Sequence, residues 1–410
     1  MKSENRIGNL TYWSGLVLAL VATVAMGLNF TAMAALLDMP GIALAIALLS
    51  ALLLFVATWR NSKRATPRRS RRNVGIIALL VLLGVVVWSV DMRFLSYRSA
   101  EIRFDNDDTR LAGTVYSPRS TGRHPAVVLV HGSGPETRRE YAFYAKMLAR
   151  NGIVGLAYDK RGAGQSTGKL YESDYGDYAH DVLEALSVLA NRDDVDPRCI
   201  GLVGFSEGEW VAPLAATQSS SVAFLVVTAP SGVSPARQVN QEIARRLRDR
   251  GYPEESVSLA LALNDRVFAY QRTGEGRDAL QRDLQVAKSQ PWFADADDIP
   301  EQLYPVEEYA WWRSVMDFDP APVWEQVKSP VLLLKGGRDQ KSDPAIARRE
   351  IQSALQKGGN KQLQFVVFPE ADHSMLNWPF GRTVPVFADG YLDTMVRWVR
   401  RQDCASSSPH

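Results

Sequence analysis

The chain has 410 residues, a hydrophobic content of 46% and a formal net charge of +2. This length allows one large domain or two ordinary ones, each able to bury a core. The near-neutral charge and the apolar content argue against a disordered chain and against broad nucleic-acid binding. We therefore expect no nucleic-acid partner.

The N-terminal part of the chain holds the apolar excess. Three runs contain no charged side chain: Trp13 to Leu37, Ile42 to Trp59 and Val74 to Val90. A charge at the centre of a membrane helix costs about 2.5 to 3.5 kcal/mol on insertion scales, so these runs predict three transmembrane helices within residues 1–91. The first run has a second interpretation as a cleaved signal, because Lys2 and Arg6 precede it and Ala32-Met33-Ala34 resembles a cleavage site.

A basic segment, Arg60 to Arg72, separates the second and third runs and holds seven Lys or Arg and no acidic residue. Short basic loops between apolar helices mark the cytoplasmic side. The third helix then delivers everything after Asp91 to the other side, and Lys2 and Arg6 agree by placing the N-terminus inside. We expect an integral protein of a bacterial plasma membrane, partnered by the lipid bilayer, with its main domain on the extracytoplasmic side.

Residues 92–410 have a different pattern, which begins with an antiparallel hairpin that includes "RLAGTVYSP". Apolar strands then follow: Ala126 to Val130, Ile153 to Tyr158, Ile200 to Phe205, Ala223 to Val227, Val331 to Lys335 and Leu363 to Phe368. Continuous β-branched runs suit strands that are covered on both faces. Tyr141 to Arg150 and Tyr178 to Leu189 have helical spacing. This alternation predicts an α/β fold with a mostly parallel sheet.

One long segment interrupts the alternation. Gln238 to Met316 is helical in pattern, rich in charge and without a clear strand. We expect a helical cap, over about residues 235–325, above the carboxyl edge of the sheet where open α/β sheets bind ligands. The alternative is plain helical packing on the side of the domain.

The stretch "GFSEGEW" places Ser206 directly after the strand that ends at Phe205 and before a helical segment that starts near Glu209. Strand, tight turn and helix are the setting of a nucleophile elbow. Gly204 and Gly208 suit the close backbone approach around such a turn. Ser206 is therefore the candidate nucleophile, and an inert serine in a glycine-rich turn is the alternative.

A serine hydroxyl needs a base to remove its proton, and that base is almost always a histidine. Of five histidines, His373 in "PEADHSM" follows a strand and emerges at the same sheet edge as Ser206. The imidazole needs a carboxylate partner. Asp339 in "LLLKGGRD" lies just past another strand at this edge, and Asp343 is the reserve candidate.

The tetrahedral intermediate of acyl transfer needs an oxyanion hole. One donor is the N–H after the nucleophile, from Glu207, and the second is an N–H of the "HGSG" loop, for which Ser133 is the candidate. Removing one such donor typically costs about 3 kcal/mol.

Two other features have structural interpretations. "GAGQSTGK" resembles a phosphate-binding loop, but its spacing is too long and Leu170 stands where Ser or Thr is needed. We read it as a turn in which Asp159 and Arg161 pair. The two cysteines, Cys199 and Cys404, are expected to be unpaired thiols, with a bridge as the alternative.

In this order, "LAGTVYSP", "PAVVLVHGSGP", "YDKRGAGQSTG", "GFSEG", "LLLKGGRD" and "ADH" resemble the α/β-hydrolase superfamily, within it the serine esterase and prolyl-oligopeptidase-like peptidase branch. The resemblance runs from about Ala100 to Arg401. It implies an eight-stranded sheet and an acyl-enzyme formed by Ser206, Asp339 and His373. Relatives often have a second glycine where this chain has Glu209, which either favours the helix N-terminus or binds a cationic substrate group.

These observations predict a membrane-anchored serine hydrolase that cleaves an acyl ester or thioester without a metal or organic cofactor. An acyl-peptide or dipeptidyl-type peptidase is the alternative enzyme, with a peptide substrate in place of a small acyl compound. A non-catalytic, membrane-tethered binding domain with the same fold is the alternative from another class. No feature of the sequence indicates an oligomeric state.

Overall fold

The computed structural model describes residues 96–378 and 385–402. The three predicted membrane segments, within residues 1–91, lie outside the described residues. Within these two ranges, no helix combines the length and the apolar character needed to cross a membrane. The chain divides into two compact units after Arg98, and the second unit, from Ser99 onward, is the one described below.

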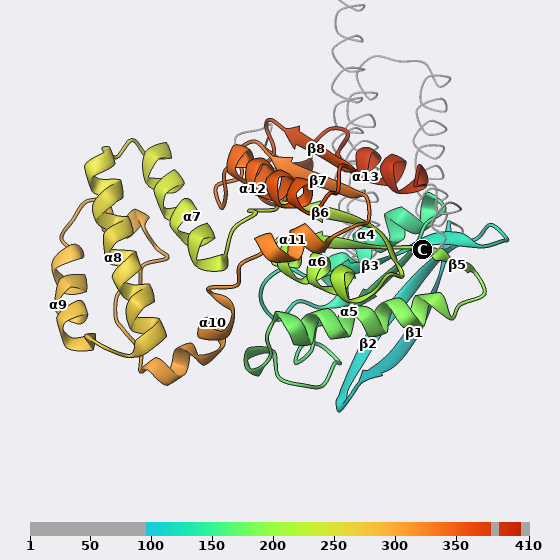
Figure 1. Cartoon of the computed structure of the whole chain (residues 1–410), viewed down its shortest axis with the longest axis horizontal. Helices are drawn as coiled ribbons and strands as arrows, with labels where there is room; N and C mark the ends of the chain where they lie inside the picture. Colours follow the sequence, from blue (N-terminus) through green and yellow to red (C-terminus); the bar gives the residue numbers. More distant parts are fainter. Residues whose placement is uncertain (1–95, 379–384, 403–410) are drawn as a thin grey trace, which may run out of the picture. The chain divides into compact units, whose positions relative to one another are not determined.

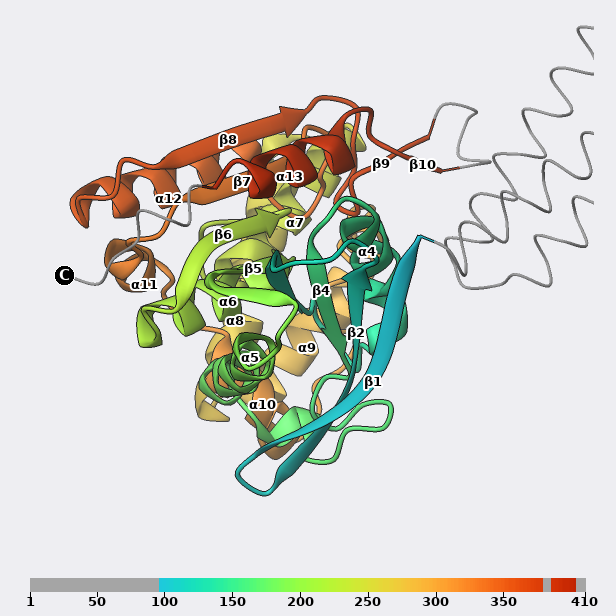
Figure 2. The same ribbon diagram turned by 90° about the vertical axis from the view of Figure 1, so that its right-hand side faces the viewer.

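An eight-stranded sheet forms the centre of this unit, in the order β1-β2-β4-β3-β5-β6-β7-β8 (Figures 1 and 2). Its strands are β1 (Tyr97–Asn106), β2 (Thr109–Pro118), β3 (His124–Val130), β4 (Val154–Tyr158), β5 (Val195–Phe205), β6 (Val222–Thr228), β7 (Val331–Gly336) and β8 (Leu363–Phe368). β2 pairs antiparallel with β4, and the pairs from β4 to β8 are all parallel. The predicted mostly parallel, eight-stranded α/β-hydrolase sheet is confirmed.

Helices cover both faces of this sheet. The elements outside the segment between β6 and β7 are α4 (Arg138–Arg150), η2 (Leu170–Glu172), α5 (Tyr175–Ala190), α6 (Gly208–Gln218), α12 (Pro344–Lys357) and α13 (Tyr391–Arg400), with a short ladder of β9 (Leu376–Asn377) and β10 (Val386–Phe387). Leu225 of β6 joins the core cluster shared with α5, α6 and α12. Its neighbour Phe224 contacts Trp398 of α13, so α13 lies on the opposite face, because successive strand residues point to opposite sides.

Strand β4 shows how close the packing on this second face is. A Cβ added to Gly155 would lie 2.9 Å from the Cα of Ala145 in α4. Only a glycine permits that approach, whereas the adjacent Leu156 packs into the other core.

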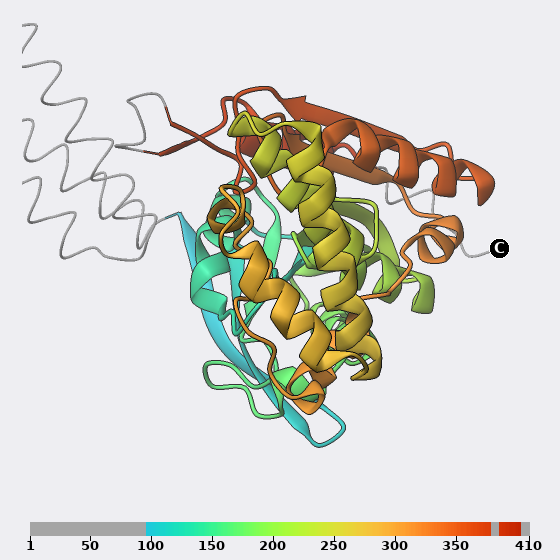
Figure 3. The same cartoon turned by 90° about the vertical axis from the view of Figure 1, so that its left-hand side faces the viewer.

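The segment between β6 and β7 is the predicted insert. It contains α7 (Pro235–Asp249), α8 (Glu254–Thr273), α9 (Arg277–Ala287), η3 (Phe293–Asp295), η4 (Val306–Tyr309), α10 (Ala310–Val315) and α11 (Ala321–Gln326), and Figure 3 shows α7, α8 and α9 side by side. α7, α8 and α9 pack around a hydrophobic cluster of their own. Arg245 of α7 donates a hydrogen bond to the carbonyl of Gly337, just beyond β7. The insert therefore contacts the carboxyl edge of the sheet.

Two expectations about single elements are wrong. β8 was expected to be covered on both faces, but it forms one edge of the sheet and Val367 is 41% exposed. Cys199 is disulfide-bonded rather than a free thiol, and Cys404 lies outside the described residues. The alternative, a bridge, applies at Cys199, and spacing along the chain could not decide between the two because a disulfide joins residues that only the fold brings together.

Candidate active site

Ser206 lies on a sharp turn between β5 and α6. Its φ angle is +50°, in the left-handed region that non-glycine residues rarely adopt. A Cβ on Gly204 would meet the carbonyl oxygen of Gly208 at 2.5 Å, and a Cβ on Gly208 would meet that of Val130 at 2.8 Å. Both glycines are thus required by close backbone approach, and the strained turn raises the Ser206 hydroxyl above the sheet edge.

The structure brings the three predicted catalytic residues together. His373, in the loop after β8, places Nε2 2.9 Å from Oγ of Ser206. Its Nδ1 lies 2.9 Å from Oδ2 of Asp339, in the loop after β7. Asp343, the reserve candidate, instead caps α12 by accepting from the N–H groups of Ala345 and Ile346. The three parallel strands β5, β7 and β8 therefore deliver the nucleophile, the acid and the base to one edge.

The protonation states follow from the partners of Asp339. Burial raises the pKa of this carboxyl, but its hydrogen bond with His373 and the charges of His373 and Lys335 outweigh burial and bring the pKa to about 2. An ionised carboxylate can only accept, so Nδ1 of His373 carries the proton that it donates to Asp339. When His373 is neutral, Nε2 faces Ser206 with a free lone pair, as a general base must.

A buried lysine completes the surroundings of Asp339. Lys335 is 0% exposed and donates from Nζ to Oδ2 of Asp339 at 2.6 Å and to Oγ of Ser342 at 2.5 Å. Burial lowers the pKa of Lys335, and the charge of Asp339 opposes this effect. The sequence analysis missed this role, although a lysine at the end of the apolar strand "VLLLK" indicates a buried cation that needs a buried partner.

The two predicted oxyanion donors belong to loops that meet. The loop after β3 carries Ser133, and the N–H of Gly132 in this loop is used by Oη of Tyr141 at 2.7 Å. The Ser133 side chain lies near enough to the carboxylate of Glu207, the residue after the nucleophile, to lower the pKa of this carboxyl, against the larger effect of burial. Lys160 contacts both loops, through the carbonyl of Gly132 and the carboxylate of Glu207, and the oxyanion role of the Ser133 and Glu207 N–H groups stays a prediction.

Glu209 does not contact a substrate site. Its side chain is 1% exposed, and its carboxylate accepts from the N–H and the hydroxyl of Ser231 and from the N–H of Gly232. Burial raises its pKa to about 7, against these hydrogen bonds. Glu209 therefore fastens the loop after β6 to α6, and binding of a cationic substrate group is ruled out by its burial.

The "DKRGAGQS" stretch forms a turn, as expected, but its predicted ion pair is absent. Arg161 binds Asp181 of α5 through Nε and Nη2, each at 2.7 Å, while Asp159 accepts from the N–H groups of Arg138 and Gln165. Asp181 was missed because it lies 20 residues further along the chain. His131 is also structural: it is buried, and burial followed by the charge of Lys160 lowers its pKa to about 3.

No group of three or more His, Cys, Asp or Glu within residues 96–378 and 385–402 is arranged to hold a metal ion. The sheet order and the contacts from Ser206 through His373 to Asp339 are those of the α/β-hydrolase superfamily, with a Ser-His-Asp triad at the carboxyl edge of the sheet.

Residues 122–379 match the family described as serine aminopeptidase, S33, and the chain belongs to this family. The narrower prolyl-oligopeptidase-like branch stays a prediction.

Named relatives share part of the sequence. Esterase EstD of Thermotoga maritima is 26% identical over 307 residues, which cover 70% of this chain and 65% of the esterase. Thiohydrolase aneE of Aspergillus aculeatus is 29% identical over 147 residues, covering 35% of this chain and 46% of that protein. The chain thus spans less than two thirds of the length of either relative.

Solved structures resemble the chain at low sequence identity. The Pyrococcus furiosus esterase Pf2001 has a TM-score of 0.48 and 19% identity, covering 76% of this chain and 93% of that one. A proline iminopeptidase of Mycobacterium smegmatis has a TM-score of 0.48 and 16% identity, covering 75% and 99%.

Proposed function

We propose that this chain hydrolyses a carboxylic ester or thioester through an acyl-enzyme on Ser206. The observation that carries the proposal is the 2.9 Å contact between Nε2 of His373 and Oγ of Ser206, with Asp339 on the other ring nitrogen. The sequence likeness to an esterase and to a thiohydrolase supports the same bond type.

The geometry supports a two-step reaction. Oγ of Ser206 attacks the acyl carbon while its proton passes to Nε2 of His373, and the carbonyl oxygen becomes an anion that the N–H groups of Ser133 and Glu207 stabilise. Collapse of this intermediate breaks the bond to the leaving group, which takes the proton from His373. Water then repeats the sequence on the acyl-enzyme and releases the acid.

An aminopeptidase is the second candidate, because the family description names that activity. Such an enzyme binds the free α-ammonium of its substrate, and an acidic side chain is the natural partner for that cation. The two glutamates next to the nucleophile do not serve this purpose: Glu207 pairs with Lys160 and Glu209 binds Ser231 and Gly232. These two glutamates are therefore not free to bind the ammonium group of a peptide substrate.

A fluorophosphonate probe tests the nucleophile. We expect the wild-type protein to be labelled and Ser206→Ala to be unlabelled, and a labelled Ser206→Ala protein would refute the assignment. Absence of label on the folded wild type would favour a non-catalytic binding domain. Short p-nitrophenyl esters and thioesters compared with aminoacyl p-nitroanilides then separate the esterase from the aminopeptidase.

We also propose that the hydrolase unit is anchored to a bacterial plasma membrane and lies outside the cytoplasm. The three uncharged runs and the basic segment Arg60 to Arg72 support this topology. A phosphatase reporter fused after Asp91 should be active, and a stable but inactive fusion would place the unit in the cytoplasm.

A further inference from the structure

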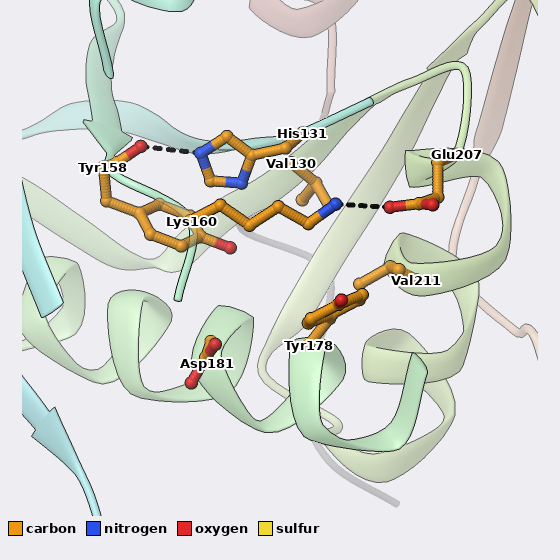
Figure 4. A pocket seen from close by; sticks show the side chains of 8 residues that line it. All are labelled: Val130, His131, Tyr158, Lys160, Tyr178, Asp181, Glu207 and Val211. Carbon is orange, nitrogen blue, oxygen red and sulfur yellow. Dashed lines mark hydrogen bonds and ion pairs between the residues drawn. The ribbon is translucent and has the colours of Figure 1, made fainter. Parts of the chain in front are cut away.

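A second buried lysine lies between the two loops that carry the oxyanion donors. Lys160 follows β4 in the "DKRG" stretch and is 4% exposed. Its Nζ donates to the carbonyl oxygen of Gly132 at 3.0 Å and to the carboxylate of Glu207, and it lies 4.5 Å from the centroid of the Tyr178 ring. Figure 4 shows the Lys160 ammonium directed at the Glu207 carboxylate, with the Tyr178 ring beside them, among the side chains that line a pocket.

The first of these bonds acts on an oxyanion donor directly. The carbonyl of Gly132 and the N–H of Ser133 belong to one planar peptide unit and point in opposite directions. A donor that fixes the carbonyl therefore also fixes the direction of the Ser133 N–H. A cationic donor in a dry environment also polarises the peptide, which makes its N–H a stronger donor.

The second bond acts on the other donor residue. The carboxylate of Glu207 is held by Lys160, while the backbone N–H of Glu207 is the predicted donor that follows the nucleophile. The side chain of Glu207 is 2% exposed, so this pair is shielded from water. The ammonium of Lys160 thus connects the side chain of Glu207 to the peptide unit that carries the N–H of Ser133.

We propose that Lys160 is a positioning residue for the oxyanion hole, holding the Ser133 and Glu207 N–H groups on the acyl oxygen of the substrate. This inference rests on the proposed acyl transfer at Ser206. In this role Lys160 does more than neutralise the charge of Glu207. Without its bond to the carbonyl of Gly132, the peptide that carries the Ser133 N–H is free to turn this N–H away from the developing oxyanion.

Lys160→Met tests this role, since methionine keeps a similar length without the charge. The substrates are a p-nitrophenyl ester and its thiono analogue, in which sulfur replaces the acyl oxygen and accepts hydrogen bonds poorly. Losing an oxyanion donor typically lowers kcat about 100- to 1,000-fold. We expect kcat for the ester to fall about 100-fold with little change in KM, and the preference for ester over thionoester to fall at least tenfold.

A double variant separates positioning from stability. Lys160→Met alone leaves the Glu207 carboxylate buried without its cation, which destabilises the fold. Lys160→Met/Glu207→Gln removes both charges and keeps the backbone N–H of residue 207, so we expect Tm to recover while kcat and the ester preference do not. Lys169→Met is the matched control, because Lys169 belongs to the same loop region and its side chain is 70% exposed.

Two results would overturn the proposal: a folded double variant with wild-type kcat and ester preference, or a loss of activity equal for ester and thionoester. Failure of the proposed function looks different, because then the wild-type protein itself takes no fluorophosphonate label and hydrolyses neither substrate. If Lys160→Met does not fold, the double variant carries the test.

Discussion

The substitution Lys335→Met examines how the fold keeps the triad carboxylate ionised. Lys335 is wholly buried, and its ammonium donates to Oδ2 of Asp339 at 2.6 Å. In the variant, the charged and buried Asp339 keeps the Nδ1–H of His373 and the N–H of Lys341 as donors. Removing one partner of a buried pair typically destabilises a protein by about 3 to 5 kcal/mol. Because Asp339 keeps two donors, we expect about 3 kcal/mol at pH 7.

The stability lost in Lys335→Met should depend on pH, because it involves the ionisation of Asp339. The pKa of Asp339 is about 2 in the folded chain, below its ordinary value of 3.8. A carboxyl with a depressed folded pKa contributes stability that is present above its unfolded pKa and is lost as the pH falls through the folded pKa. For Asp339 this window runs from about pH 4 to pH 2 and holds roughly 2 kcal/mol. Without Lys335 the pKa of Asp339 rises, so the contribution shrinks and disappears at higher pH.

Urea unfolding of the full-length chain, followed by tryptophan fluorescence between about pH 2 and pH 8, measures both effects. The control is Lys357→Met, which removes an ion pair with Glu325 whose lysine side chain is 73% exposed. Exposed pairs contribute about 0 to 1 kcal/mol, so this control should unfold nearly as the wild type does. If Lys335→Met is as stable as the control at pH 7, or loses stability in acid in parallel with the wild type, the reasoning is wrong.

Three further substitutions test the site. Asp339→Asn should lower kcat about 10,000-fold with little change in KM, because an amide favours the wrong tautomer of His373, and an unchanged pre-steady-state acylation rate would contradict this. Gly208→Ala should lower kcat about 100-fold, since the new Cβ would lie 2.8 Å from the carbonyl oxygen of Val130 and displace the turn by up to about 1 Å; wild-type ester kinetics would show that the turn tolerates a side chain. Glu209→Gln should lower Tm by several degrees, because replacing a buried acceptor typically costs about 1 to 3 kcal/mol of stability. The same variant should leave the ratio of kcat/KM for cationic and neutral esters unchanged. A shift in that ratio would show that Glu209 does contact the substrate.

Much of the sheet could be predicted from the sequence because buried parallel strands leave continuous apolar runs. The run Ala126 to Val130 became most of β3, and Leu363 to Phe368 became β8. The exposure of β8 was not predictable, because its place at the edge depends on strand order rather than on its own composition. The ladder of β9 and β10 was missed because two-residue strands leave no periodic pattern.

The candidate site was predictable to the extent that its residues follow strands. Asp339 and His373 could be chosen because each stands just beyond an apolar run, and parallel strands end at one edge. Partner choice was not predictable in the same way: Arg161 binds Asp181 on α5 rather than Asp159, because both oxygens of Asp181 face its guanidinium in a bidentate pair. Two partners near in sequence need not be near in the orientation that a guanidinium requires.

The two buried lysines, Lys335 and Lys160, support different parts of the proposed reaction. Lys335 contacts the acid that orients the base, and Lys160 contacts the loops that face the acyl oxygen. A hydrophobic residue in either place would often stabilise a protein at least as well as a buried ion pair does. An apolar side chain, however, cannot donate to a carbonyl or hold a carboxylate charged. The proposed chemistry of Ser206 therefore requires the hydrogen bonds that these two ammonium groups donate. Burying the ammonium groups lowers the free energy of unfolding relative to apolar side chains in the same places.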